Sequence, residues 1–318
     1  MYDLTKMSLV NMCECGLALR HLCNSANSME DVSNRIIQYF YENFIDKLSG
    51  EKSCVLVRFF KTHSYGKLTP ELQEYARQVL GNDVVSDSLK CLTLLATAGK
   101  LPEWNSRHQS KGHQVIPLSS EKVISRIPMI YQLIHQFGLN PSNIITQPDP
   151  HLLYDLEQRI YNVFYVSDAL DSPFIPSQNS FVIPFRIKSV IGFGGVLPSG
   201  NMFAIVMFLK VRVPKFVVDL FPSLALNIKM IVVPFDNESI FNEQCQASVN
   251  SSITTTTNKD EILHINSKIG TLTKLLDVEL KEIENKIQQM EAHLNQSDSF
   301  HQSNNGNHKK NLGESGLS

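Results

Sequence analysis

Residues 189–208, SVIGFGGVLPSGNMFAIVMF, are the feature that most constrains the fold of this chain. Two apolar runs of strand length flank Pro198-Ser199-Gly200-Asn201, a segment of residues that favour turns. A type I turn favours proline at its second position and glycine at its fourth. Because so short a connection cannot carry a crossover helix, the two runs must pair as antiparallel neighbours. The chain is therefore expected to contain an antiparallel sheet.

The glycines of this segment, Gly192, Gly194 and Gly195, could serve a phosphate-binding loop or a strand. A glycine-rich loop that cradles a phosphate leads into a helix, so that free backbone N–H groups face the anion. Here a turn and a second strand follow instead. We therefore assign these glycines to the first strand, where glycine marks a bulge or the close approach of another backbone or of a ligand.

The rest of residues 17–235 alternates helix and strand signals. An amphipathic helix is expected from Val32 toward Leu48, after an N-cap at Asn27 or Ser28. Further helices are expected at residues 70–80, 121–137 (kinked at Pro128) and 215–231, and strands at residues 53–60, 89–96, 181–187, 189–196 and 202–211. This order favours an α+β fold, an antiparallel sheet with helices packed on one face.

Composition limits the partners that this chain is expected to bind. Apolar residues make up 42% of the 318 residues, which is enough for a buried core, and the formal net charge is −2. This charge balance disfavours nucleic acid and an anionic membrane surface as partners. No apolar run reaches the roughly 18 to 20 residues that span a bilayer, and charged residues interrupt the N-terminal apolar segment, so neither a membrane span nor a secretory signal is expected.

The cysteine content predicts a reducing compartment, and hence a cytoplasmic protein. Six cysteines are scattered along the chain, and Cys54 and Cys91 lie in apolar runs where a thiol acts as a small hydrophobic group. Cys13 and Cys15 with Cys23 could hold a soft metal or form a redox pair, but their spacing is not that of a zinc ribbon. We expect no metal site, and the role of Cys13 and Cys15 stays open.

Residues 261–295 carry a heptad pattern that predicts a long helix after the sheet domain. Apolar residues recur at steps of three and four, with one additional four-residue step. The pattern favours a parallel homodimeric coiled coil, and one amphipathic helix folded back on the domain is the alternative. The polar residues 236–260 are expected to form a low-complexity linker, and residues 296–318 a disordered tail. The expected dimer contacts are Ile262, Ile265, Ile269, Leu272, Leu276, Leu280, Ile283, Ile287, Met290 and Leu294.

Several motifs of residues 17–235 resemble the GAF family of small-molecule sensor domains. They are Glu30-Asp31-Val32 in the first helix, Val182-Ile183-Pro184-Phe185, the hairpin of residues 189–208 and the closing segment 220–235. The resemblance implies a GAF/PAS-like sheet with a ligand pocket, and a last helix antiparallel to the first. Within the family, the chain is most similar to the input regions of bacterial two-component sensor histidine kinases. A coiled coil after such a domain implies a signalling helix, and residues 1–16 are expected to be a separate N-terminal segment.

The segment 104–113, WNSRHQSKGH, is the main candidate for a binding site. It lies between a strand and a helix, where the resemblance implies the lid of the pocket. An aromatic face and cationic donors suit an anionic or aromatic ligand, and a solvated loop is the alternative. Haem would need an axial His or Cys, and a bilin would need a pocket Cys, so the cofactor stays unknown. The expected ligand-binding residues are Arg58, His63, Cys91, Trp104, Arg107, His113 and Phe193.

These features predict a non-enzymatic cytosolic sensor that binds a small molecule or responds to redox state and dimerises through its C-terminal helix. Neither His264 nor His293 is followed by the acid of a kinase phosphoacceptor site, and no glycine-rich ATP-binding segment follows. The chain is therefore expected to act on a kinase or other output protein in trans, or to be a truncated or split sensor kinase. The alternatives are a dimeric adaptor without ligand, and a GAF-type methionine-sulfoxide reductase that uses Cys54 and Cys91 on adjoining strands.

Overall fold

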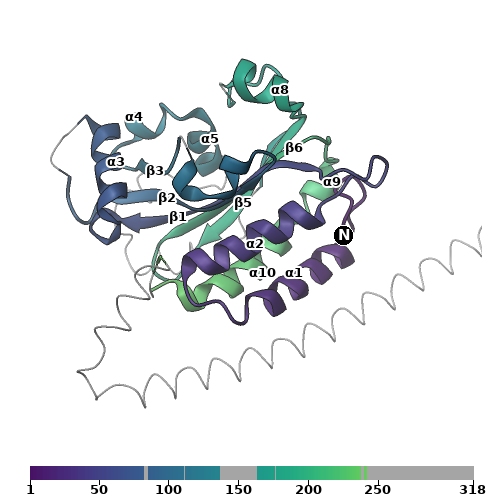
Figure 1. Ribbon diagram of the computed structural model, residues 1–318, viewed down its shortest axis with the longest axis horizontal. Coiled ribbons are helices and arrows are strands. Elements are labelled where there is room, and N and C mark those ends of the chain that lie inside the picture. The colour runs from purple at the N-terminus through teal and green to yellow at the C-terminus, as the bar shows by residue number, and fades with distance from the viewer. Residues whose placement is uncertain (82–84, 111, 137–162, 176, 238–239, 242–318) are drawn as a thin grey trace, which may run out of the picture. The chain divides into compact units, whose positions relative to one another are not determined.

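The computed structural model describes residues 1–81, 85–110, 112–136, 163–175, 177–237 and 240–241 (Figure 1). The chain divides into two compact units, residues 1–250 and 251–318, and every described residue belongs to the first. The expected coiled-coil helix over residues 261–295 and the tail over 296–318 lie outside the described residues, as does most of the linker over 236–260.

The described strands form one antiparallel sheet in the order β3-β2-β1-β6-β5-β4. This confirms the α+β class and the antiparallel sheet. The first long strand, β1, lies at the centre, where it pairs with β2 on one side and with β6 on the other. The strands are β1 (Cys54–Ser64), β2 (Lys90–Gly99), β3 (Val115–Pro117), β4 (Phe164–Val166), β5 (Ser189–Val196) and β6 (Met202–Leu209).

Three helices, α1 (Leu9–Cys23), α2 (Met29–Asn43) and α10 (Phe221–Val232), cover one face of the sheet (Figure 1). Ser28 begins α2 as expected, because its hydroxyl accepts a hydrogen bond from the Asp31 N–H at 3.0 Å. The rings of Phe40 near the end of α2 and of Phe221 at the start of α10 both contact Phe193 of β5. Beyond α10, the Ile240 carbonyl accepts a hydrogen bond from the N–H of Glu30 in the first turn of α2. The two helices therefore run antiparallel, as the GAF resemblance implies.

Shorter helices cover the other face, so the expectation that helices pack on one face only is wrong. They are α4 (Glu121–Ile124), α5 (Pro128–Gln136), the π-helix η4 (Gln178–Val182) and α8 (Ile183–Phe185). Their apolar side chains, among them Ile124, Leu133 and Val182, form a second core with β1, β2 and β6. Both faces of these strands carry apolar residues, and a sheet of that kind needs a cover on each side.

The prediction of a strand over residues 181–187 is wrong, because residues 178–185 are helical. Gln178 organises it: its side-chain amide donates to the carbonyls of Ala169 and Ile175, and its Oε1 accepts from the Asp171 N–H. Pro184 has no N–H to give to a sheet ladder. The segment ends at Arg186, whose φ of 55° lies in the left-handed region. The part of the GAF resemblance that rests on a Val-Ile-Pro strand therefore loses its support.

One further expected helix is confirmed, two are each divided into two helices, and one helix was not predicted. Helix α3 (Pro70–Leu80) follows Thr69 and ends at Gly81, which adopts the left-handed conformation (φ 78°). The helix expected over 121–137 is broken before Pro128, which begins α5. The closing helix expected over 215–231 is divided into α9 (Lys215–Val218) and α10. The boundary expected between residues 16 and 17 falls inside α1, which was not predicted.

The hairpin of residues 189–208 is confirmed in detail. The Gly200 N–H donates to the Leu197 carbonyl at 2.8 Å, which closes the expected turn between β5 and β6. A Cβ at Gly194 would lie 2.0 Å from the carbonyl oxygen of Phe203, so only glycine permits the approach of β6 at this point. This glycine therefore serves strand pairing, and not a phosphate or a pocket wall.

One described stretch, Lys215–Phe235, is long and apolar enough to cross a membrane by length and composition alone. In the structure its apolar residues Phe221, Leu224, Ile228 and Val232 are buried against the sheet. Core helices of soluble proteins share this composition.

The 3₁₀ helices of the described residues are η1 (Tyr65–Lys67), η2 (Pro102–Asn105), η3 (Arg107–Gln109) and η5 (Val233–Phe235).

Candidate functional site

A cavity of about 280 Å³ lies on the face of the sheet that α4 and α5 cover. Apolar side chains of β1 and β6 form its floor, among them Leu56, Phe60 and Val206. The start of α5 at Pro128 and the ring of Phe181 from η4 contribute to its walls. The volume lies just below the range of small-molecule sites, which runs from roughly 300 to 1,000 Å³. The cavity is therefore suited to a small, mainly apolar ligand.

Arg58 is the central polar group of this cavity. It lies in the middle of β1, half-buried, and its guanidinium donates one hydrogen bond to the Ser110 hydroxyl at 3.1 Å. Its Nε is buried without a hydrogen-bond partner, and no carboxylate of the described part of the chain forms an ion pair with it. Burial lowers the pKa of Arg58 to about 10, so it remains a cation at neutral pH. A half-buried cation without a carboxylate partner among the described residues is suited to binding an anion.

Two further cationic or titratable side chains border the cavity. His113 lies at its mouth with φ 59°, a left-handed conformation that is uncommon outside glycine. Desolvation, and then the positive charge of Arg58, lower the pKa of His113, so its imidazole is neutral at pH 7. Arg126, at the end of the helical turn of α4, is largely exposed. The polar groups of this site are thus mainly hydrogen-bond donors.

Trp104 forms an aromatic wall of the same cavity. Its ring centroid lies 5.5 Å from that of Phe181 and 4.7 Å from that of Phe185. The side chain of Asn105 fixes the preceding loop, because it accepts a hydrogen bond from the Gly99 N–H at 3.0 Å and donates one to the Gly99 carbonyl at 3.1 Å. A Cβ at Gly99 would lie 2.9 Å from the Trp104 ring. The loop that carries Trp104 is therefore fixed by the bonds between Asn105 and Gly99, and the Trp104 side chain packs closely against Gly99.

The structure thus brings Arg58, Trp104 and His113 together, as expected for a pocket. It does not bring the other four candidates to this cavity. Arg107 is buried and pairs through its Nε with Glu30 of α2 at 2.5 Å, and its guanidinium stacks over the Phe241 ring at 4.4 Å. The assignment of Arg107 to the pocket is therefore wrong: it joins η3 to α2.

His63, Cys91 and Phe193 lie on the opposite face of the sheet, under the long helices. Successive side chains of a strand alternate between faces, and His63 is an odd number of residues from Arg58, so the two cannot share a face in regular β1. His63 pairs across the sheet with Cys91 of β2, a member of the core under α1, α2 and α10. Phe193 packs between the rings of Phe40 and Phe221 in that core. These three pocket assignments are wrong.

The thiols named for a reductase do not approach one another. Strands β1 and β2 do adjoin, but Cys91 lies opposite His63 and Cys54 lies at the other end of β1. Burial raises the pKa of Cys91 to about 12 and raises that of Cys54 still further. A thiol of that kind is a poor nucleophile. The described geometry therefore gives no support to a reductase that uses this pair.

The N-terminal cysteines lie on α1. Cys15 and Cys23 are buried toward the core, where burial raises the pKa of Cys15 strongly and that of Cys23 to about 11. Among the residues that the structure describes, no group of three or more His, Cys, Asp or Glu side chains could hold a metal ion.

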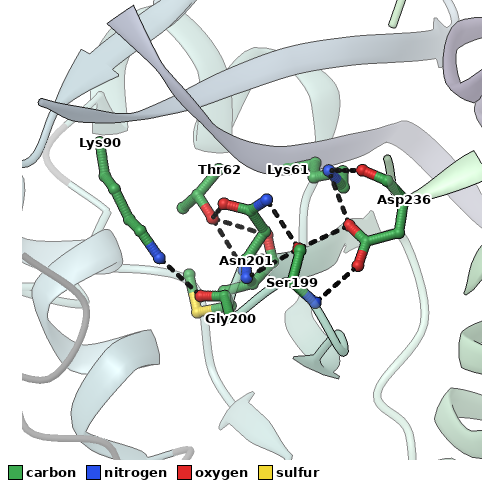
Figure 2. Close-up of polar contacts among 8 residues, drawn as sticks. Lys61, Thr62, Lys90, Ser199, Gly200, Asn201 and Asp236 are labelled. Carbon is green, nitrogen blue, oxygen red and sulfur yellow. Dashed lines mark hydrogen bonds and ion pairs between the residues drawn. The ribbon is translucent and has the colours of Figure 1, made fainter. Parts of the chain in front are cut away.

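A second polar cluster lies on the face of the sheet that α1, α2 and α10 cover, at the turn between β5 and β6 (Figure 2). The Lys61 ammonium lies 3.1 Å from the Asp236 carboxylate, and the two side chains are only 1% and 2% exposed. The same carboxylate accepts hydrogen bonds from the Ser199 N–H at 2.9 Å and the Ser199 hydroxyl at 2.8 Å. We call Lys61, Asp236 and Ser199 the buried clasp.

Neighbouring residues extend the buried clasp across the turn. Asn201 donates to the Ser199 hydroxyl through its side-chain amide at 2.7 Å, and the Thr62 hydroxyl accepts from the Met202 N–H at 2.8 Å. Lys90 of β2 donates to the Gly200 carbonyl at 2.7 Å. The clasp therefore ties the central strand, the hairpin turn and the residue that follows η5 into one network. Every acceptor of the Lys61 ammonium in it is internal, which indicates a structural role.

Comparison with models of known protein families finds no match for this chain, and comparison with curated proteins finds no significant match. The function must therefore be inferred from the site itself.

Proposed function

We propose that this chain is a non-enzymatic sensor module that binds a small apolar anion in the cavity around Arg58. The observation that carries the proposal is a half-buried guanidinium, without a carboxylate partner among the described residues, at the centre of an apolar cavity. A carboxylate on a short aliphatic or aromatic body would neutralise Arg58 and bury its body against the floor of the cavity. The GAF resemblance, which also implies a ligand-binding sensor, remains a prediction.

The donor set favours an acid over a base or a neutral polar compound. Arg58 offers its free Nε–H, and neutral His113 can donate one ring N–H at the mouth. Trp104, Phe181 and the apolar floor offer contacts for a hydrocarbon or an aromatic ring. A hydrogen bond to a charged group contributes about 1.5–3 kcal/mol, which corresponds to roughly a 10- to 100-fold change in affinity.

Strand β1 provides a route from the cavity to the end of the domain. Arg58 faces the cavity, and Lys61, three residues further along the same strand, faces the opposite side and holds Asp236. In the proposed mechanism, a ligand that shifts Arg58 changes the position of β1 and with it the buried clasp. Residue 236 also begins the segment that leads to the predicted signalling helix. An output protein, such as a kinase, would then respond in trans.

The test uses Trp104, the only tryptophan of the chain, as a reporter within the site. Titration with octanoate is expected to change the tryptophan fluorescence, while 1-octanol, which has the same chain length without the carboxylate, should bind at least tenfold more weakly. Arg58→Met is expected to weaken octanoate binding about 10- to 100-fold. Arg77→Met, which removes a cation from the exposed face of α3, is the matched control and should bind octanoate like the wild type.

Equal binding of octanoate and octanol, or octanoate binding unaffected by Arg58→Met, would contradict the assignment of an anion site. A cavity that binds neither probe would favour a dimeric adaptor without ligand. The predicted coiled coil is tested separately in the full chain by sedimentation, where Ile269→Lys together with Ile283→Lys is expected to convert a dimer into a monomer.

A further inference from the structure

A hollow of about 410 Å³ with a strongly basic lining lies at one end of the sheet, apart from the cavity around Arg58. At this end β1 and β5 begin while β2 and β6 end. Because these four strands are neighbours in the antiparallel sheet, the residues that flank them meet there. The flanking residues that line the hollow are Lys52 before β1, Lys100 after β2, Lys188 before β5 and Lys210 after β6.

The backbone holds three of these lysines in line. The N–H of Lys188 donates to the Leu209 carbonyl at 2.7 Å, that of Lys210 to the Ser53 carbonyl at 2.8 Å, and that of Lys100 to the Val55 carbonyl at 2.9 Å. These bonds continue the pairing of the sheet beyond the ends of its strands. Neighbouring strands lie about 4.8 Å apart. The sheet thus places one lysine beside the end of each of four adjacent strands, and these bonds fix the backbones of Lys100, Lys188 and Lys210.

Arg186 adds a fifth cation to the hollow from the segment that ends α8. Its φ of 55° is unusual for a residue with a side chain, and the Arg186 N–H is fixed by a hydrogen bond to the Ile183 carbonyl. Backbone conformations of this kind are enriched at functional sites. The chain thus holds an arginine in a strained conformation beside the row of lysines.

Few carboxylates balance this charge. The hollow contains two, Asp46 and Glu51, and the oxygens of Asp46 accept hydrogen bonds from its own loop, from the Leu48 N–H and the Ser49 hydroxyl. Glu51 pairs with Lys210 at 2.8 Å. The pKa of the Glu51 carboxyl is lowered mainly by that bond, and also by Lys100 and Arg186.

The Lys52 ammonium forms an ion pair with the Glu42 carboxylate at 2.7 Å, and Glu42 does not line the hollow. Within the described residues, no carboxylate forms an ion pair with Lys100, Arg186 or Lys188. Five cationic side chains thus line the hollow against two carboxylates, Asp46 and Glu51, in a chain whose formal net charge is −2.

We propose that this hollow is a binding site for a phosphorylated anion, either a free phosphate ester or the phosphorylated headgroup of a lipid. A phosphate monoester carries about −1.5 to −2 charges at neutral pH and three acceptor oxygens, which match the three unpaired cations. The guanidinium of Arg186 can bind two phosphate oxygens at once, and the lysines add point charges. The proposal is independent of the cavity around Arg58.

Two exposed apolar residues adjoin the hollow and bear on the source of the phosphate. Leu48, between Asp46 and Ser49, is 93% exposed, and Ile183, directly before Pro184, is 52% exposed. Apolar side chains beside a basic site can enter the headgroup region of a membrane. A lipid-borne phosphate would use them, whereas a free phosphate ester would not.

The experiment measures binding of the full chain to inositol 1,4,5-trisphosphate by calorimetry, with inositol as the uncharged control, and cosedimentation with phosphatidylcholine vesicles with and without phosphatidylinositol 4,5-bisphosphate. Lys100→Gln, Arg186→Gln and Lys188→Gln combined are expected to weaken binding at least tenfold. Lys6→Gln, Lys67→Gln and Lys122→Gln combined remove the same charge from exposed positions outside the hollow and should leave binding unchanged.

Binding of the soluble trisphosphate supports a free phosphate ester as ligand. Binding confined to vesicles that contain the phosphorylated lipid, and weakened by Leu48→Ser with Ile183→Ser, supports a headgroup. Failure of both probes to bind the wild type, an equal loss in the two triple variants, or equally tight binding of a 20-nucleotide RNA would overturn the proposal. Because the substituted lysines and Arg186 are exposed, all variants should keep the thermal midpoint of the wild type within a few degrees.

Discussion

Lys61→Met is expected to destabilise the folded protein strongly, because the Lys61 side chain is only 1% exposed and pairs with Asp236. The substitution keeps the length of the side chain and removes its ammonium. Asp236, whose side chain is 2% exposed, would then keep only the two hydrogen bonds from Ser199. Removal of one partner of a buried ion pair leaves the other charge uncompensated and costs roughly 3–5 kcal/mol. The midpoint of thermal unfolding should fall by about 6 to 20 °C for a domain of this size.

A double-mutant cycle separates the ion pair from other contributions. Asp236→Asn alone is expected to be destabilising because it leaves Lys61 buried without a counter-ion, and burial already lowers the pKa of Lys61. The double variant Lys61→Met with Asp236→Asn carries neither charge. Its loss of unfolding free energy should therefore be smaller than the sum of the single losses, by roughly 2–3 kcal/mol.

Urea unfolding followed by Trp104 fluorescence measures these free energies. Lys215→Met is the control, because it removes an ammonium from the exposed i,i+4 pair with Asp219, and should cost less than about 1 kcal/mol. A loss below about 1 kcal/mol for Lys61→Met, or strict additivity in the cycle, would refute the reasoning that the pair is buried and coupled.

Two further predictions concern stability. His63 is fully buried, and both ring nitrogens lack a hydrogen-bond partner of good geometry among the described residues; desolvation, then Lys61 and Lys67, lower the pKa of its imidazole far below 6.5. The folded protein therefore keeps His63 neutral while the unfolded chain binds a proton near pH 6.5, so unfolding free energy falls as the pH is lowered, by about 2 kcal/mol between pH 7 and 5. Urea unfolding of His63→Leu should lose that part of the slope, and an unchanged slope would contradict it. Gly194→Ala should cost about 1–3 kcal/mol or more by the same assay, because its Cβ would meet the Phe203 carbonyl, whereas Gly112→Ala, with open space around it, should be neutral; equal stabilities would contradict the close approach.

Local signals predicted much of the fold. Thr69, Pro70 and Gly81 set the ends of α3, and the turn at Gly200 set the hairpin, because the residues that decide these features lie within a few positions of one another. The strand expected over residues 181–187 was wrong because side-chain hydrogen bonds decide this segment. The amide of Gln178 bonds to the carbonyls of two earlier residues, and this stabilises a helical turn that apolar patterning does not show.

The sequence predicted only part of the candidate site, because some of its residues are brought together by contacts that no local pattern indicates. Arg58 and Trp104 could be paired because the nearby strand and loop suggested a common cavity. The alternation of β1 would have excluded His63, which lies an odd number of residues from Arg58. The pairing of Arg107 with Glu30 joins residues 77 positions apart, and no spacing in the sequence indicates it. Arg126 also lines the cavity, and it lies between α4 and Pro128, where the single helix expected over residues 121–137 is broken.

The central place of β1 has a consequence for the synthesis of the chain. Leu56 of β1 pairs with Phe208 of β6, so at 5 to 20 residues per second the partner strand leaves the ribosome roughly 10 to 30 seconds later. During that interval one edge of β1 has no neighbour, and an apolar edge of this kind is prone to pair with other chains. Lys61 and Arg58 place two cations on that strand, which disfavours such pairing. We therefore expect the lysine that becomes buried in the finished sheet to disfavour aggregation of the growing chain before β6 arrives.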